Sequence, residues 1–205
     1  MLSDMPEKRD FEERYKEGDT PWELDRPDHN LTGMVTGRPI SRCRVLEIGC
    51  GTGANAVWLA KQDFEVTACD RSRTAIKRAV KRAEDAGVEC TFLTIEYIQD
   101  QVSGGAFGFV FDRGCFHSLD SDEDRQKFAE NASSHLKKGG LWLSLIGNAD
   151  EDRQDEGPPQ HSAAAVVTAV EPFFEIISLA SGQFDSNNPD PARAWICLMQ
   201  KREVK

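Results

Sequence analysis

Three glycines, Gly49, Gly51 and Gly53, alternate along the segment that follows a short apolar run and precedes a helix-like stretch. Glycine serves where a backbone turns sharply and where a ligand must come close to the main chain. A strand, a glycine turn and a helix in this order are typical of a cofactor-binding site. We therefore expect Gly49, Cys50 and Gly51 to contact a cofactor.

Two classes of cofactor use this construction. Gly49-x-Gly51-x-x-Ala54 satisfies the dinucleotide fingerprint, and Asp70 stands about 20 residues further on, where an acid holds a ribose. Glu47-x-Gly49-x-Gly51-x-Gly53 resembles the first motif of the class I S-adenosylmethionine-dependent methyltransferases, and this resemblance implies a nucleoside that carries an amino acid. Asp70 has a second interpretation as a helix cap. The glycine turn alone does not separate the two classes.

Glu47 favours the second class, because it is a carboxylate at the end of an otherwise apolar strand. A buried carboxylate has to be paired, and an α-ammonium group would pair with it directly or through water. A pyrophosphate at the same place would be repelled. The sequence also lacks the Tyr-x-x-x-Lys pair of many nicotinamide reductases and a separate catalytic domain.

Further candidate cofactor residues follow the second and third strands. Glu96 could accept a hydrogen bond from the amino group of adenine, and Arg71, next to Asp70, is assigned to the same site. Tyr97 would either flank the adenine or lie at the surface. An exposed glutamate after a strand is common, so Glu96 has an ordinary surface role as its alternative.

Candidate catalytic residues come after the fourth strand. Asp112 lies at the carboxyl end of that strand, where open α/β sheets bind ligands. His117 could serve as a general base, because the unperturbed pKa of histidine lies near neutrality. The alternatives are a cap or an ion pair with Arg113 for Asp112, and a structural histidine for His117. His161 could reach the rim of an acceptor site.

These residues need an α/β framework to position them. Apolar runs alternate with helix-like stretches, which indicates a parallel sheet. The final two strands resemble an antiparallel hairpin at one edge, after a polar segment at 148–159 that is expected to form a mobile loop. The expected strands are 44–48, 64–69, 89–95, 107–111, 141–146, 174–181 and 194–200, and the expected helices are 54–61, 72–86, 122–136 and 162–170, with a turn at 137–140.

Composition limits the partners and the compartment. The chain has 205 residues and a net charge of −10, so it suits one domain and would repel nucleic acid. No apolar run is long enough to span a membrane, and the first residues do not resemble a signal peptide, so we expect a cytoplasmic protein. Six cysteines without metal-ligand spacing predict no metal site, and His29 and His135 are expected at the surface.

The combined motifs resemble those of the class I S-adenosylmethionine-dependent methyltransferases. The segment Val45-Leu-Glu47-Ile-Gly49-Cys-Gly51-Thr-Gly53 is close to their first motif, and Asp70 matches their ribose-binding acid. Residues 107–114 and 136–140 resemble their fourth-strand and fifth-strand motifs, with Gly108 and Lys138 as departures. The resemblance implies a Rossmann-like seven-stranded sheet, mostly parallel with a reversed edge strand and helices on both faces. It also implies S-adenosylmethionine as cofactor and S-adenosylhomocysteine as product.

A narrower resemblance lies in residues 1–40, which we expect to form an N-terminal arm or lid of the same domain as residues 41–205. Gly18-Asp-Thr20-Pro21-Trp22-Glu23 is similar to a segment of the thiol, halide and thiopurine methyltransferases, and bacterial tellurite-resistance methyltransferases share the architecture. The resemblance implies that the arm folds over the cofactor, with Trp22 near its methionine portion.

The sequence thus predicts methyl transfer from S-adenosylmethionine to a small acceptor, with a thiol or another soft nucleophile favoured. Methylation of a protein and a non-catalytic S-adenosylmethionine-binding module are the alternatives, and a nicotinamide-dependent reductase is disfavoured. Neither the acceptor nor the oligomeric state follows from these motifs.

Overall fold

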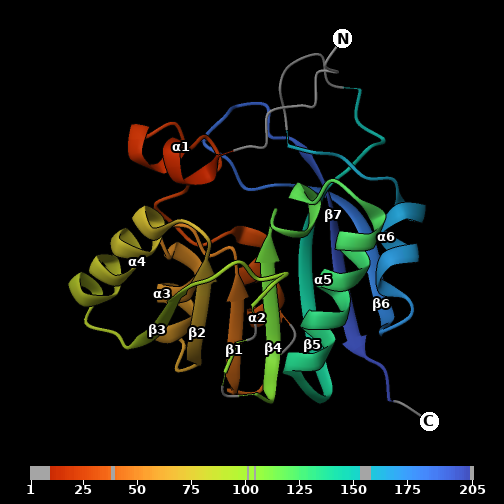
Figure 1. Cartoon of the computed structure of the whole chain (residues 1–205), viewed down its shortest axis with the longest axis horizontal. Helices are drawn as coiled ribbons and strands as arrows, with labels where there is room; N and C mark the ends of the chain where they lie inside the picture. Colours follow the sequence, from red (N-terminus) through yellow and green to blue (C-terminus); the bar gives the residue numbers. More distant parts are fainter. Residues whose placement is uncertain (1–9, 38–39, 101, 104, 153–157, 204–205) are drawn as a thin grey trace.

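The computed structural model describes residues 10–37, 40–100, 102–103, 105–152 and 158–203, and its centre is a seven-stranded sheet (Figure 1). The strand order is β3-β2-β1-β4-β5-β7-β6. The first five strands are parallel, and β7 runs antiparallel to both of its neighbours. This arrangement confirms the predicted sheet. The strands are β1 (Arg44–Ile48), β2 (Glu65–Asp70), β3 (Cys90–Thr94), β4 (Phe107–Arg113), β5 (Leu136–Gly147), β6 (Phe174–Gln183) and β7 (Arg193–Lys201).

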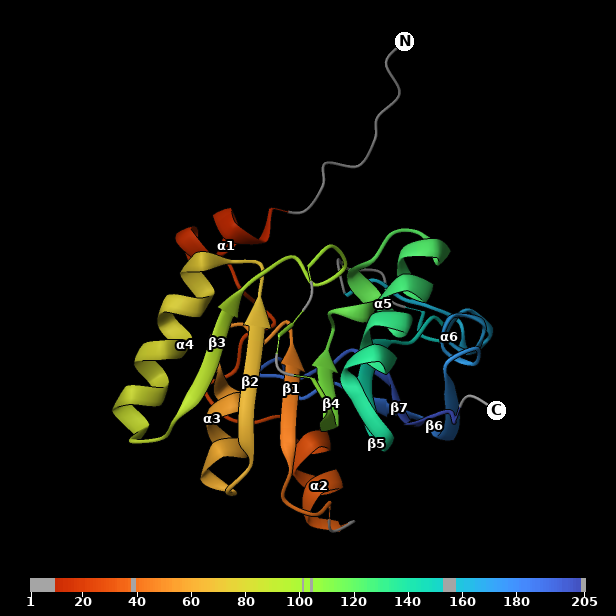
Figure 2. The ribbon, with the colours of Figure 1, turned by 60° about the horizontal axis from the view of Figure 1, so that its bottom comes forward.

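Helices cover both faces of the sheet, as predicted. Apolar side chains of α2, α3 and α4 join a core cluster on one face, whereas those of α5 and α6 join a second cluster on the other (Figure 2). The helices are α1 (Phe11–Glu17), α2 (His29–Gly37), α3 (Ala54–Lys61), α4 (Arg73–Ala86), α5 (Asp122–His135) and α6 (Ala163–Val170), and a 3-10 turn η1 spans Phe116–Ser118.

Local sequence signals explain the limits of α4. The Ser72 hydroxyl accepts a hydrogen bond from the amide of Ala75 and caps the first turn, and Gly87 ends the helix at φ 66°. Serine satisfies otherwise unpaired amides at a helix start, and glycine adopts a left-handed conformation at little cost. Both ends of this helix agree with the sequence prediction.

Strand β1 directs its side chains alternately to the two faces. Leu46 and Ile48 pack in the cluster with α5 and α6, whereas Val45 packs in the cluster with α2 and α3. Glu47 shares the face of Val45, since strand side chains alternate. The alternation therefore directs the Glu47 carboxylate toward α3.

The predicted turn at 137–140 is wrong, because β5 already begins at Leu136. Phe107 pairs with Leu136 and Phe109 with Leu141, so β5 advances five residues while β4 advances two. The extra residues form a bulge in which Gly139 has a φ of 69°. A glycine pair that looks like a loop in the sequence is absorbed into a strand by this pairing.

The first part of the arm, residues 10–28, lies at the carboxyl ends of the central strands, which the arrowheads of β1, β2 and β4 mark in Figure 1. Its described residues, 10–37, contain α1 beside the start of α4 and α2 on the face covered by α3. Residues 1–9 of the predicted arm and residues 153–157 of the predicted loop lie outside the described residues. None of the described helices has the length and apolar character that crossing a membrane would require.

Candidate active site

The glycine turn connects β1 to α3 at the carboxyl edge of the sheet. Gly49, Gly51 and Gly53 have φ angles of 69°, 52° and 81°. A Cβ on Gly49 would lie 3.0 Å from the Cβ of Cys115, and one on Gly53 would lie 2.9 Å from that of Ala79. Backbone conformation and close packing both require glycine here.

Glu47 is a buried carboxylate directly before this turn, with 2% of its surface exposed. Its Oε1 accepts a hydrogen bond of 3.0 Å from Nδ2 of Asn55, whereas Oε2 has no partner among the described residues. Burial raises the pKa of Glu47 to about 8. A buried oxygen without a donor is costly, so this atom is suited to a ligand that brings a cation or an N–H group.

Asp70 ties the end of β2 to the glycine turn. Its Oδ2 accepts from the amide of Gly51 at 2.9 Å, and its Oδ1 accepts from the amide of Ser72 at 2.8 Å. Burial raises the pKa of Asp70 to about 6. A carboxylate oxygen has more than one acceptor site, so both oxygens retain capacity for hydroxyl donors such as those of a ribose.

Arg71 and Glu96 meet beside Asp70, at the ends of β2 and β3. Their side chains form an ion pair of 3.1 Å, and both are partly exposed. The Arg71 guanidinium also lies 5.9 Å from the ring centre of Phe11 in α1. The structure therefore brings these two predicted residues together, within reach of the arm.

Tyr97 lies in the hydrophobic core, whereas the sequence suggested a position beside the adenine or at the surface. It is 4% exposed, and its ring centre lies 4.9 Å from that of Phe128 in α5. The surface alternative is wrong, and the core position gives no support for a contact with adenine. His135 was expected at the surface but is also buried, where its Nε2 accepts from the amide of Val102 at 3.1 Å.

Asp112 is fully buried, and each of its carboxylate oxygens accepts a hydrogen bond from the protein. Its Oδ1 accepts from Nε1 of Trp142 at 2.9 Å, and its Oδ2 accepts from the amide of Phe116 at 3.0 Å. Burial raises the pKa of Asp112 to about 6. These contacts hold the segment after β4 in place, so the geometry favours a positioning role for Asp112.

His117 and His161 lie together beyond the ends of β4 and β5. Nδ1 of His117 accepts from the amide of Gly147 at 2.9 Å, so a neutral His117 carries its proton on Nε2. Nε2 of His161 lies 3.0 Å from the carbonyl oxygen of His117 and donates to it. Burial lowers the pKa of His161, which favours its neutral form.

Trp22 is enclosed by aromatic and basic side chains of its own arm. Its Nε1 donates to the hydroxyl of Tyr15 at 3.0 Å, and its ring centre lies 5.6 Å from that of Phe11. The Arg14 guanidinium lies 4.4 Å from the centre of the indole. This cluster fixes the shape of the arm around Trp22.

Glu23 is a site residue that the sequence did not identify as one. Its Oε1 accepts from the Tyr15 hydroxyl at 2.6 Å, and its Oε2 accepts from the amide of Thr52 at 3.3 Å and from the Thr52 hydroxyl. A Cβ on Gly51 would lie 2.1 Å from Oε1. The only sequence signal was its position directly after Trp22 in the arm motif.

Arg113 was considered as a partner for Asp112, but it binds three residues of two other segments. Its Nε donates to Oδ2 of Asp28 at 2.7 Å, Nη1 to the carbonyl of Trp22 at 2.9 Å and Nη2 to the carbonyl of Asp185 at 2.6 Å. Asp28 and Trp22 belong to the arm, and Asp185 belongs to the β6–β7 connection. Arg113 therefore joins both covering segments to the end of β4.

Glu12 docks α1 on the start of α4. Its carboxylate accepts from the Ser72 hydroxyl at 2.7 Å and from the amide and hydroxyl of Thr74 at 3.1 and 2.8 Å. These hydrogen bonds lower the pKa of Glu12 to about 2. The interaction also places a negative charge at the positive end of a helix dipole.

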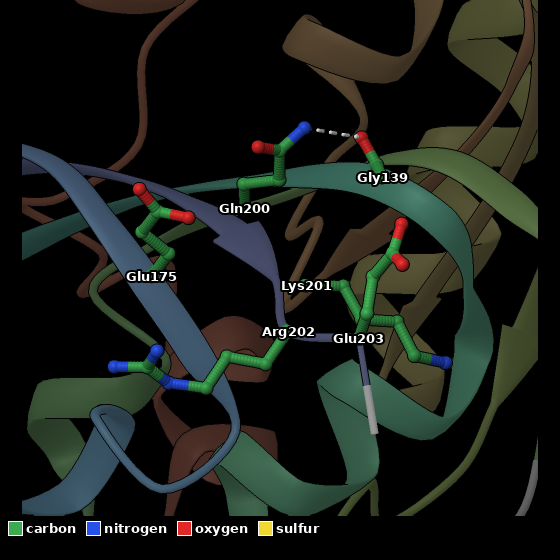
Figure 3. A pocket seen from close by; sticks show the side chains of 6 residues that line it. All are labelled: Gly139, Glu175, Gln200, Lys201, Arg202 and Glu203. Atoms are coloured by element: carbon green, nitrogen blue, oxygen red, sulfur yellow. Dashed lines mark hydrogen bonds between the residues drawn. The ribbon is translucent and has the colours of Figure 1, made fainter. Parts of the chain in front are cut away.

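A separate pocket lies where β6 begins and β7 ends (Figure 3). Gln200 donates to the carbonyl of Gly139 at 3.2 Å, and Lys201 donates to the carbonyl of Leu136. This pocket is at the amino-terminal side of β5, whereas the glycine turn follows the carboxyl end of β1. The residues that line it are Gly139, Glu175, Gln200, Lys201, Arg202 and Glu203. They are not part of the candidate active site.

Comparison with known proteins gives the same class as the geometry. Residues 45–140 match a family described as "Methyltransferase domain". Probable thiol methyltransferase 2 of Arabidopsis thaliana is 28% identical over 84% of this chain and 76% of its own length. Ubiquinone biosynthesis O-methyltransferase of Rickettsia canadensis (strain McKiel) is 32% identical over 51% of this chain, and this match spans only 42% of that protein.

Solved structures share the fold. The N-methyltransferase NodS from Bradyrhizobium japonicum WM9, in complex with S-adenosylhomocysteine, superposes with a TM-score of 0.73 at 19% identity. The superposition covers 93% of this chain and 96% of NodS. The chain is a class I S-adenosylmethionine-dependent methyltransferase, and its cofactor is S-adenosylmethionine. The partnerless oxygen of Glu47 and the remaining acceptor capacity of Asp70 fit the ammonium and ribose groups of that cofactor.

Proposed function

We propose that this small-molecule methyltransferase methylates a thiol. The observation that carries the proposal is the arm from Tyr15 to Glu23, folded onto the glycine turn by Tyr15, Glu23 and Thr52. The same arm motif resembles thiol methyltransferases, and the similarity to the Arabidopsis thiol methyltransferase extends over most of the chain. A covered site of this kind favours a small acceptor over a protein.

The cofactor residues take the following roles in this proposal. Glu47 pairs with the α-ammonium group, directly or through water, and Asp70 accepts from the ribose hydroxyls. Backbone atoms of Gly49, Cys50 and Gly51 line the methionine portion. Arg71 and Glu96 border the adenine, and Trp22 closes the arm over the methionine portion. Bound S-adenosylmethionine supplies a methyl group made electrophilic by its sulfonium charge.

The protein's contribution is chiefly alignment and exclusion of water. A displacement at a methyl carbon requires the nucleophile about 3 Å away and in line, and fixing this geometry removes much of the barrier. Arg113 holds the arm and the β6–β7 connection over the carboxyl edge, which favours a closed site. A thiol with a pKa near 8.5 already supplies some thiolate at neutral pH.

Proton removal from the acceptor is assigned to the pair of histidines. His117 uses Nδ1 to accept from Gly147, so it is less suited to act as a base at that atom. His161 donates through Nε2 to the carbonyl of His117, which leaves Nδ1 as the acceptor atom of its neutral ring. We therefore assign His161 as the proton acceptor and His117 and Asp112 as residues that position it. This assignment revises the sequence-based choice of catalytic residues.

A turnover screen tests the function. The protein is incubated with S-adenosylmethionine and separate sets of thiols, halides, amines, alcohols and carboxylates, and S-adenosylhomocysteine formation is measured. We expect the highest kcat/KM with a thiol, and the Asp70→Ala variant serves as the control for the cofactor site.

Preferential turnover of alcohols or amines would contradict the thiol assignment. Failure of every small acceptor, together with labelling of one protein in a cell extract, would identify a protein methyltransferase instead. Tight binding of S-adenosylhomocysteine without any turnover would indicate a binding module.

A further inference from the structure

Three carboxylates from different parts of the chain surround the glycine turn. Glu47 comes from β1, Asp70 from the end of β2 and Glu23 from the arm. Gly51 lies between two of them, since its amide donates to Asp70 and its α-carbon faces Glu23. The negative potential of Glu23 and Asp70 also acts on Glu47 and raises its pKa.

Hydrogen bonds hold the Glu23 carboxylate at the turn. Oε1 accepts from the Tyr15 hydroxyl, and Oε2 accepts from the amide and hydroxyl of Thr52. Thr52 is 8% exposed, so this contact lies at the inner side of the arm. Two oxygens with three donors define one orientation for the charge.

Neighbouring cations pair with other acids. Arg71 pairs with Glu96 at 3.1 Å. Arg82 donates to the carbonyl and hydroxyl oxygens of Thr52, so it reaches Glu23 only through Thr52, and it pairs with Asp25 at 3.3 Å. Within the described part of the chain, no lysine, arginine or histidine forms an ion pair with Glu23.

A second, independent observation indicates that a ligand binds at this cluster. Oε2 of Glu47 is buried and has no hydrogen-bond partner among the described residues. With Glu23 and Asp70, Glu47 forms a cluster of acidic side chains at the glycine turn, where the missing Cβ atoms leave the main chain open to a ligand. An acidic cluster of this kind favours the ligand that carries more positive charge.

S-adenosylmethionine and S-adenosylhomocysteine differ in their net charge. Both carry an α-ammonium and an α-carboxylate, but the methylated form has an additional positive charge on sulfur. Charges within several ångströms interact strongly where water is partly excluded. The fixed carboxylate on the arm is placed to act on this difference.

We propose that Glu23 is a specificity-determining residue that favours the sulfonium cofactor over its neutral thioether product. The inference rests on the proposed cofactor site at the glycine turn. Because the methyl transfer removes the sulfonium charge, the same carboxylate assists the exchange of product for a new cofactor. In this way a carboxylate of the arm makes binding depend on the charge of the bound nucleoside.

Calorimetry on the full chain tests this inference without turnover. The dissociation constants of S-adenosylmethionine and S-adenosylhomocysteine are measured, in the absence of an acceptor, for the unmodified protein and for Glu23→Gln. We expect the ratio of the two constants to shift about tenfold toward S-adenosylhomocysteine, which corresponds to about 1.4 kcal/mol. The shift should shrink in high salt, since the interaction is electrostatic.

Two further variants separate charge from structure. Glu23→Asp keeps the charge and should largely retain the ratio, even where both affinities fall. Glu13→Gln removes an exposed acid of the same arm, which pairs with Lys16, and should leave the ratio unchanged. If Glu23→Gln leaves the ratio of the two dissociation constants unchanged, whether or not both affinities fall, the inference is overturned. Binding of neither nucleoside by the unmodified protein would instead refute the proposed cofactor site.

Discussion

Glu47 is a buried acid whose protonation links pH to stability and to ligand binding. Its pKa of about 8 in the folded protein exceeds the ordinary value of 4.5, because burial disfavours the charge. A group with a raised pKa contributes stability that is present below pH 4.5 and is lost as the pH rises toward 8. The cofactor-free protein therefore loses stability in the neutral range through this residue.

The first prediction compares Glu47→Gln with the unmodified protein at several pH values. Between pH 6 and 8 the unmodified protein should lose about 2 kcal/mol of unfolding free energy relative to the variant. Denaturant unfolding measures the difference, and saturating S-adenosylhomocysteine should reduce it by pairing the carboxylate. Parallel pH curves for both proteins would show that Glu47 does not titrate in this range.

The second prediction concerns Asp70, which we assign to the ribose. Asp70→Ala should weaken S-adenosylhomocysteine binding by about 1–3 kcal/mol, since hydrogen bonds to a charged acceptor are lost. Calorimetry measures the change. Asp85→Ala, which removes an exposed acid paired with Lys81 at the far end of α4, is the matched control. Unchanged affinity in Asp70→Ala would remove this residue from the site.

At the scale of elements, the sequence predicted most of the fold because each signal was local. Strand β1 was identified from its apolar run, and helix α4 from Ser72 at its start and Gly87 at its end. The sequence signal of the glycine pair Gly139-Gly140 was misleading, because a bulge against β4 makes this apparent loop part of β5. Whether Gly139 continues a strand depends on a partner about 30 residues away, which periodicity does not encode.

The candidate site was predictable in part for the same reason. Glu47 and Asp70 were identified because each adjoins a glycine turn or a strand end. Glu23 and Arg113 were missed, since their roles come from contacts with Thr52 and with the β6–β7 connection. The surface alternative for Tyr97 was wrong, because a residue after a strand can face either solvent or the core.

The third prediction addresses the arm as a lid. If α1 and the residues around Trp22 close over the cofactor, amide hydrogen exchange in residues 10–30 should slow when S-adenosylhomocysteine is added. Glu12→Gln should raise exchange in α1 before addition, because it weakens the contact with Thr74. Exchange rates that are identical in free and bound protein would make the arm a fixed extension.

At the scale of the whole molecule, Arg113 connects segments far apart in the chain. Its partner Asp28 is 1% exposed, so the ion pair is buried on that side. Breaking a buried pair is costly, because the remaining charge has no compensation. Arg113 should therefore matter to global stability as well as to closure of the site.

The fourth prediction is that Arg113→Met destabilises the fold by about 3 kcal/mol. Adding Asp28→Asn should recover part of this loss, because the uncompensated charge is then absent. Chemical denaturation of both single variants and the double variant gives the coupling energy. Strict additivity of the two single effects would contradict the assigned ion pair.

The placement of β7 between β5 and β6 has a consequence for biosynthesis. The strand that fills this gap leaves the ribosome after both of its neighbours, so β5 and β6 each present an unpaired backbone edge until residues 193–201 emerge. Exposed strand edges are templates for association between chains. A nascent chain stalled before β7 thus has its glycine turn complete but its sheet divided, which makes it a substrate for chaperones rather than a smaller enzyme.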